Sequence, residues 1–123
     1  MKDDCTTSEL RLLRQLRGEV WEAELGKHLG ELMEHFRTWE GKRLSAFDLS
    51  DKIHNFHDDT ARSLYGIYTN SDVRLGVARG IALGFLEKGR VGEVLAAKLE
   101  PLIELCKHGR ESEHPLEDAG RKK

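Results

Sequence analysis

The chain has 123 residues, which suits a single domain, and its 22 Asp and Glu nearly balance its 20 Lys and Arg for a net charge of −2. This balance argues against a nucleic-acid or anionic-membrane binder, which normally carries a clustered positive field. Leucine is common (18 residues) while valine (5) and isoleucine (4) are scarce. Because leucine favours helices and β-branched residues favour strands, the composition predicts an all-α fold.

Neither a targeting segment nor a membrane span is expected. The chain starts Met1-Lys2-Asp3-Asp4, which is acidic and lacks the apolar core of a secretory signal. The longest uncharged apolar stretch, Gly80 to Leu86, is far shorter than the roughly 20 residues that cross a bilayer. Cys5 and Cys106 lie near opposite ends of the chain, and we interpret them as reduced thiols. The sequence therefore predicts a cytoplasmic protein.

The first helix is expected to begin at Thr6, because Thr6 and Glu9 fit a capping box. The residues that follow place apolar or small side chains along two neighbouring lines at helical spacing. The first line is a heptad seam of Leu25, Leu29, Leu32, Phe36 and Trp39, and the second consists of Leu16, Val20, Ala23, Gly26, Gly30 and Met33. A helix with two such lines is expected to contact two partners. A helix that is unbroken from Thr7 to Trp39 would be about 50 Å long, which is longer than a compact domain of this size. Either Gly18 breaks the helix, or the helix extends beyond the domain and is covered by something else.

A second helix is expected to begin at Ser45, where Leu44, Ser45 and Asp48 form another N-terminal signature. The run Asp58-Asp59-Thr60 is expected to kink this helix or restart it. Residues 69–72 are expected to form the next loop, in which Ser71 or Asn70 would cap the helix that follows.

A third helix, from about Asp72 to Lys88, is apolar nearly all round, as is typical of a buried helix, and Gly89 is expected to close it. The fourth segment starts near Val91 and should kink or restart at Pro101, because proline lacks a backbone donor. These elements predict a four- to five-helix bundle with a long N-terminal helix. We expect a flexible N-terminus at residues 1–5, a single helical domain at residues 6–108 and a disordered tail at residues 109–123.

Glycines recur every fourth residue on two of the predicted helices, at Gly26 and Gly30 and at Gly76, Gly80 and Gly84. Residues four apart share a helix face, and each glycine costs about 1 kcal/mol relative to alanine in a helix interior, so close approach of another helix is the expected compensation. Either these glycines permit tight packing within the chain, or they form a self-complementary interface between copies. Arg79 is predicted to be an edge residue with its stem on apolar surface, or to form an ion pair between subunits.

The histidines suggest a second kind of site. Glu24, His28, Glu31 and His35 follow one another at helical spacing on the first helix, and His54, His57 and Asp58 lie close together on the second. Imidazoles and carboxylates at such spacing can share a divalent metal, which makes His54, His57 and Asp58 candidate ligands. The alternative interpretation is a hydrated helix face with local pairing, in which His57 is half-buried.

The sequence contains no phosphate-binding loop and no helix suited to reading base edges, and no catalytic residue or cofactor is expected. We therefore expect a non-enzymatic cytoplasmic protein that acts through helix–helix association, as a homodimer or as an adaptor for a protein partner. Gly26, Gly30, Gly76, Gly80, Gly84 and Arg79 are its predicted interface residues. The alternative is a small metal-binding protein or metal-dependent enzyme that uses the His/Asp cluster on the second helix.

Overall fold

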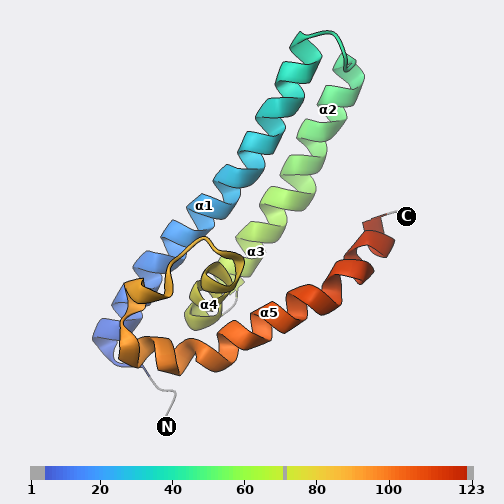
Figure 1. The fold of residues 1–123 in the computed structure, drawn as a ribbon. Coiled ribbons are helices and arrows are strands. Elements are labelled where there is room, and N and C mark those ends of the chain that lie inside the picture. The colour runs from blue at the N-terminus through green and yellow to red at the C-terminus, as the bar shows by residue number, and fades with distance from the viewer. Residues whose placement is uncertain (1–4, 71, 122–123) are drawn as a thin grey trace. The chain divides into compact units, whose positions relative to one another are not determined.

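The computed structural model describes residues 5–70 and 72–121 and the side chains as far as residue 109, and every element in these ranges is helical (Figure 1). The elements are α1 (Thr7–Glu40), α2 (Ala46–Asn55), the π-helical segment η1 (Phe56–Ala61), α3 (Arg62–Asn70), α4 (Val73–Leu83), the short 3₁₀ segment η2 (Lys88–Val91) and α5 (Glu93–Arg121). The predicted all-α fold with a long N-terminal helix is confirmed.

The chain divides into two compact units, each of which we describe by itself. One, the α4–α5 unit, comprises Met1–Val20 and Asp72–Lys123, and the other, the hairpin unit, is Trp21–Ser71. The single domain expected for residues 6–108 spans parts of both. The predicted flexible N-terminus falls, apart from Cys5, outside the described residues, as do the side chains of the predicted tail beyond residue 109.

The core of the α4–α5 unit is aliphatic. Its fully buried side chains include Leu13, Leu16, Val20, Val77, Leu99 and Ile103, contributed by α1, α4 and α5. Ion pairs join charged residues around it: Lys98 Nζ lies 2.8 Å from Glu9 Oε1, and Arg90 Nη2 lies 3.0 Å from Glu19 Oε1. Burial of the apolar side chains is the main contribution to the stability of this unit, since an exposed ion pair such as Arg90–Glu19 contributes little.

The first helix begins as the capping box predicts. The backbone N–H of Glu9 donates to Thr6 Oγ1 at 3.0 Å, and the backbone N–H of Thr6 donates to Glu9 Oε1 at 2.9 Å. The helix then continues for 34 residues through Gly18, so the chain does not break there. Likewise α5 is one helix that passes through Pro101, so the chain does not restart at that proline.

Helix α4, which corresponds to the predicted third helix, is shorter than the sequence predicts. It is capped by Asp72, whose side chain accepts from the Arg74 N–H at 2.8 Å, so the prediction of Ser71 or Asn70 as the cap was wrong. It ends at Leu83 because Gly84 adopts a left-handed conformation with φ +88°. Gly89, predicted to close this helix, instead lies within η2. The apolar run to Leu86 therefore continues past the end of the helix.

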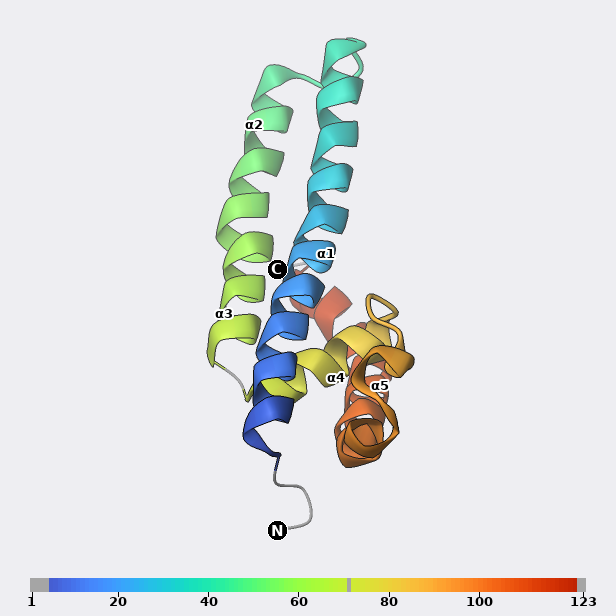
Figure 2. The same ribbon diagram turned by 90° about the vertical axis from the view of Figure 1, so that its left-hand side faces the viewer.

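The hairpin unit pairs α1 with the continuous rod formed by α2, η1 and α3, which run side by side in opposite directions in both ribbon views (Figures 1 and 2). The rod begins at Ser45, whose Oγ accepts the Asp48 N–H at 3.0 Å, as predicted. At Asp58-Asp59-Thr60, where a kink or restart was expected, the chain stays helical and forms the wider π-turn of η1.

Candidate association surface

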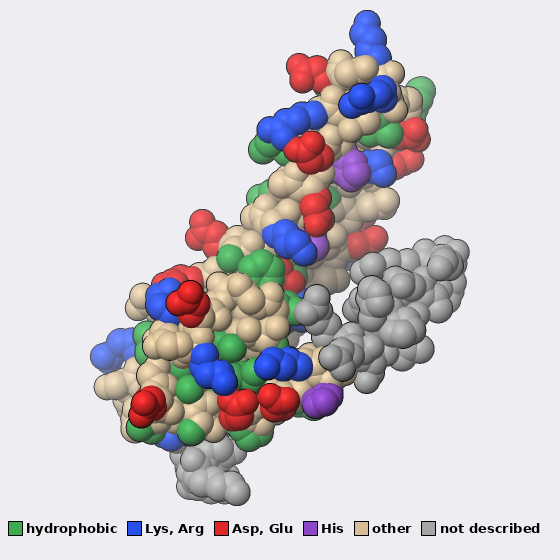
Figure 3. All heavy atoms as spheres, viewed as in Figure 1, with side chains coloured by type: hydrophobic (Ala, Val, Ile, Leu, Met, Phe, Trp, Pro, Cys, Tyr) green, Lys and Arg blue, Asp and Glu red, His purple; other side chains and the backbone are tan. Residues whose placement is uncertain are grey.

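Large apolar side chains are exposed mainly on the hairpin unit. Seven of the nine exposed large hydrophobics among the described residues lie there: Leu29, Met33, Phe36, Trp39, Phe47, Ile53 and Tyr65. Figure 3 shows hydrophobic side chains at the surface between charged side chains of both signs on the face that it presents. Because large exposed apolar patches on protein surfaces commonly mark interaction sites, the hairpin unit is the candidate region for association.

Three of these residues follow one line along α1. Leu29, Met33 and Phe36 are spaced at i, i+4 and i+7, which places them on one face of the helix, and their exposed fractions are 45%, 50% and 40%. We call this face the α1 stripe and define it as Ala23, Gly26, Leu29, Gly30, Met33 and Phe36, all of which are exposed.

The two glycines of the α1 stripe leave the helix backbone uncovered. A Cβ atom placed on Gly26 or Gly30 would meet nothing within 4 Å. Among the described residues, no atom therefore approaches α1 closely at these two positions. The prediction that Gly26 and Gly30 belong to an interface stays a prediction, on a surface that is open.

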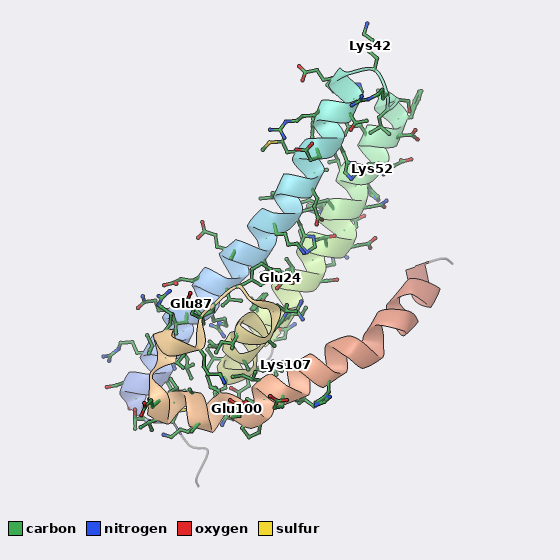
Figure 4. The ribbon with its side chains drawn as sticks, viewed as in Figure 1. Glu24, Lys42, Lys52, Glu87, Glu100 and Lys107 are labelled. Atoms are coloured by element: carbon green, nitrogen blue, oxygen red, sulfur yellow. The ribbon has the colours of Figure 1, made fainter. Side chains whose placement is uncertain are left out.

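An aromatic cluster fixes the opposite side of α1 against α3. The Tyr68 hydroxyl donates to Glu24 Oε1 at 2.5 Å, and Trp21 stacks on Tyr68 with ring centroids 6.0 Å apart. The Tyr65 ring meets Trp21 edge-on at 5.9 Å. Both Glu24 and Tyr68 are buried, and Figure 4 shows Glu24 on the side of α1 that faces α3. These contacts fix which face of α1 packs against α3, so the α1 stripe lies on the face turned away from α3.

Glu24 was expected to lie on a hydrated face with His28, Glu31 and His35, and this expectation was wrong for Glu24. Its side chain is 5% exposed and is bound by Tyr68, which lies 44 residues later in the chain. Glu31 fits the expectation, since it is exposed and its Oε1 lies 3.1 Å from His28 Nδ1. Local spacing predicted the short-range pair but gave no signal for the distant tyrosine.

Charged residues lie at both ends of the α1 stripe. Arg37 is at the C-terminal end, where its Nη2 lies 3.1 Å from the Met33 sulfur and its guanidinium also pairs with Glu34. Glu22 is exposed at the N-terminal end. The stripe is therefore bounded by an acidic side chain at one end and a basic one at the other.

The glycines of α4 differ from those of α1. A Cβ on Gly80 would lie 2.6 Å from Cγ1 and 3.0 Å from Cβ of Val20, and closer still to Cγ2. Gly76 is also buried. Gly84 caps the helix and is not part of its face, so the expected three-residue stripe on this helix was wrong. Gly80 serves packing within the chain.

Arg79, predicted to be an edge residue or an intersubunit partner, is half-buried on α4. Its charge acts on Cys106 of α5: burial raises the pKa of the Cys106 thiol, and the nearby guanidinium opposes that rise. A raised pKa keeps this thiol protonated and unreactive near neutral pH.

The structure brings the candidate ligands His54, His57 and Asp58 together at the junction of α2 and η1. Asp58 Oδ2 lies 2.8 Å from His54 Nε2 and Oδ1 lies 3.2 Å from His57 Nδ1. The hydrogen bond to His57 is the main cause that lowers the pKa of Asp58, and the His54 charge adds to it. The His57 side chain is 78% exposed, so its expected half-burial was wrong. Within the described residues, no group of three or more His, Cys, Asp or Glu is placed to hold a metal ion.

No protein family, curated protein or solved structure matches this chain. None of the helices within the described ranges is long and apolar enough to cross a lipid bilayer.

Proposed function

We propose that this protein is a non-enzymatic association module whose contact surface is the α1 stripe. The observation that carries the proposal is the uncovered face of α1, on which exposed Leu29, Met33 and Phe36 lie beside the open backbone of Gly26 and Gly30. Burying such side chains against a partner removes apolar surface from water, which is the main driving force of association.

A helix is the partner that suits this face best. Gly26 and Gly30 each cost about 1 kcal/mol relative to alanine in a helix interior. At Gly80 the close approach of Val20 compensates such a cost, whereas no described part of the chain does so at Gly26 and Gly30. A second helix lying along the α1 stripe would supply the missing contacts.

We take a second copy of the chain as that partner, because two-fold homo-oligomers are the commonest assemblies of soluble proteins. We also propose a cytoplasmic location, in keeping with a chain that has only two cysteines, near its opposite ends.

The test is the oligomeric state of the full chain, measured by multi-angle light scattering and sedimentation between about 1 and 100 μM, the range of moderate homodimer affinities. The double variant Leu29→Glu/Met33→Glu places two charges on the α1 stripe and should be monomeric, since burying unpaired charges is costly. Leu105→Glu is the matched control, because Leu105 is 61% exposed on α5, and it should associate like the wild type.

Circular dichroism on all three proteins establishes that helix content is unchanged. A wild-type chain that is monomeric over the whole range would overturn the proposal. So would association that the double variant leaves intact. A wild-type oligomer that this variant alone dissociates would support it.

A further inference from the structure

The α1 stripe changes in side-chain size along its length. Its N-terminal half holds the small residues Ala23 and Gly26, and its C-terminal half holds the large residues Met33 and Phe36, with Leu29 and Gly30 at the centre. A surface with small residues at one end and large ones at the other fits a copy of itself only when that copy is reversed.

We infer that two copies pack α1 against α1 in antiparallel orientation, about a two-fold axis that crosses between Leu29 and Gly30; this inference rests on the function proposed above. Residues at equal distances from the axis then face each other across the interface. Ala23 meets Phe36 of the second copy, Gly26 meets Met33, and Leu29 meets Gly30. Every one of these pairs joins a small residue to a large one, so side chains of one helix fill the space that the other leaves open.

The parallel arrangement lacks this fit. In a parallel two-fold pair each residue faces its own counterpart, so Gly26 would face Gly26 and leave a gap, while Phe36 would face Phe36 and hold the helices apart. Gaps forfeit contact energy and crowded large residues strain the packing. The gradient of size therefore selects the reversed orientation.

The charged ends of the α1 stripe favour the same orientation. Glu22 and Arg37 are also equidistant from the proposed axis, so each would face the opposite charge on the second copy. Arg37 already pairs with Glu34 of its own helix, and its Nη2 lies 3.1 Å from the Met33 sulfur, so Glu22 of the second copy would be an additional partner for its guanidinium. A parallel pair would instead oppose Glu22 with Glu22, and like charges across an interface disfavour that register.

The proposed contact extends over the 16 residues from Glu22 to Arg37, or about 24 Å of helix at 1.5 Å per residue. Beyond each end of this contact, Glu40 of one copy would approach Glu19 of the other. Glu19 is already bound by Arg90 of its own chain, with Nη2 3.0 Å from Oε1 and 3.2 Å from Oε2, so its charge is compensated there.

Disulfide trapping tests the orientation. In a chain with Cys5 and Cys106 replaced by serine, we would prepare Gly26→Cys and Met33→Cys separately and oxidise each alone and as a mixture. In the antiparallel pair each single cysteine lies about 10 Å along the axis from its counterpart, too far for a disulfide, whereas position 26 faces position 33. Only the mixture should give a covalent dimer, and intact mass spectrometry should identify it as the mixed species.

A charge exchange tests the register. Glu22→Arg and Arg37→Glu should each raise the dimer dissociation constant about five- to tenfold, or roughly 1 kcal/mol, and the double variant should return it to within about twofold of the wild-type value. Lys27→Glu is the control, because Lys27 is an exposed residue of α1 outside the α1 stripe, and it should leave the constant unchanged.

The outcomes separate this inference from the function on which it rests. A wild-type dimer in which the single cysteines cross-link to themselves, or in which the charge exchange fails to restore affinity, overturns the antiparallel register and leaves association through the α1 stripe intact. A monomeric wild-type chain overturns both. Mixed cross-links together with restored affinity support the arrangement.

Discussion

Val20 of α1 packs against Gly80 of α4 so closely that no side chain larger than hydrogen fits at position 80. A Cβ there would lie 2.6 Å from Cγ1 of Val20, well inside van der Waals contact. Both residues are buried. This contact explains why a helix interior in the core tolerates a glycine that by itself disfavours the helix.

Gly80→Ala should therefore destabilise the protein. The added methyl group gains about 1 kcal/mol of helix propensity but overpacks the contact with Val20, at a cost of about 1–3 kcal/mol, so we expect a net loss of up to about 2 kcal/mol in the free energy of unfolding. Urea denaturation followed by circular dichroism measures it. Val20→Ala should relieve the overpacking. Gly80→Ala should therefore lower the free energy of unfolding less in the Val20→Ala background than in the wild type. An equal loss in both backgrounds would contradict this explanation.

The open glycines of α1 should respond in the opposite direction. Gly18, Gly26 and Gly30 have nothing within 4 Å of a substituted Cβ, so alanine at each gains helix propensity without a clash. We expect each single variant to raise the free energy of unfolding by about 0.5–1 kcal/mol. These measurements belong at low protein concentration, where association does not contribute. A loss of stability at Gly18, which lies outside the α1 stripe, would show that the space there is not open.

Tyr68→Phe should weaken the hairpin unit. The substitution keeps the ring that stacks on Trp21 but removes the hydroxyl that donates to the buried Glu24. Loss of a buried hydrogen bond to a carboxyl group costs about 1–3 kcal/mol. Urea denaturation measures the loss, with tryptophan fluorescence as a local probe at Trp21. The exposed Tyr65, whose side chain is not buried, provides the control, since Tyr65→Phe should change the free energy of unfolding by less than about 0.5 kcal/mol.

Acid should destabilise the α4–α5 unit. The hydrogen bond from Lys98 is the main cause that lowers the pKa of Glu9 below 4.5, and that from Arg74 lowers the pKa of Asp72 below 3.8. A carboxyl group whose pKa is lower in the folded state contributes stability above its unfolded-state pKa and loses it as pH falls. The urea midpoint should therefore drop as pH falls below about 5. Lys98→Met should make that drop shallower, and an unchanged pH profile in this variant would contradict the assignment to Glu9.

Two helix starts were predictable from capping residues that are neighbours in the sequence, whereas the cap of α4, Asp72, was not. The hydrogen bonds at Thr6 and Ser45 join residues three apart, so their pattern is visible in the chain itself. The end of α4 was not predictable in the same way. An apolar run to Leu86 has helical composition, but Gly84 takes a left-handed conformation, and composition does not distinguish a glycine that ends a helix from one that lies within it.

Long-range contacts were the parts that the sequence did not predict. The spacing of the glycines pointed correctly to close packing at Gly80, yet nothing in the pattern named Val20 as the residue that covers it. Glu24 has the same spacing as the half-buried His28 and His35 and the exposed Glu31, yet it is buried and accepts a hydrogen bond from Tyr68. Such pairs depend on tertiary packing, which overrides local propensity and periodicity.

The π-turn of η1 acts as a one-residue insertion that the hairpin has absorbed. Leu49 and Ile67 are 18 residues apart, about five turns of a regular α-helix, so an uninterrupted rod would align Ile67 with the buried Leu49. The fully buried residue is instead Tyr68, one position later, because the π-turn accommodates one more residue than an α-turn. We therefore expect the fold to tolerate substitutions at Phe56–Ala61, where no residue is buried, but not the deletion of a residue there. A chain shortened there by one residue would turn Tyr68 away from Glu24 and Trp21.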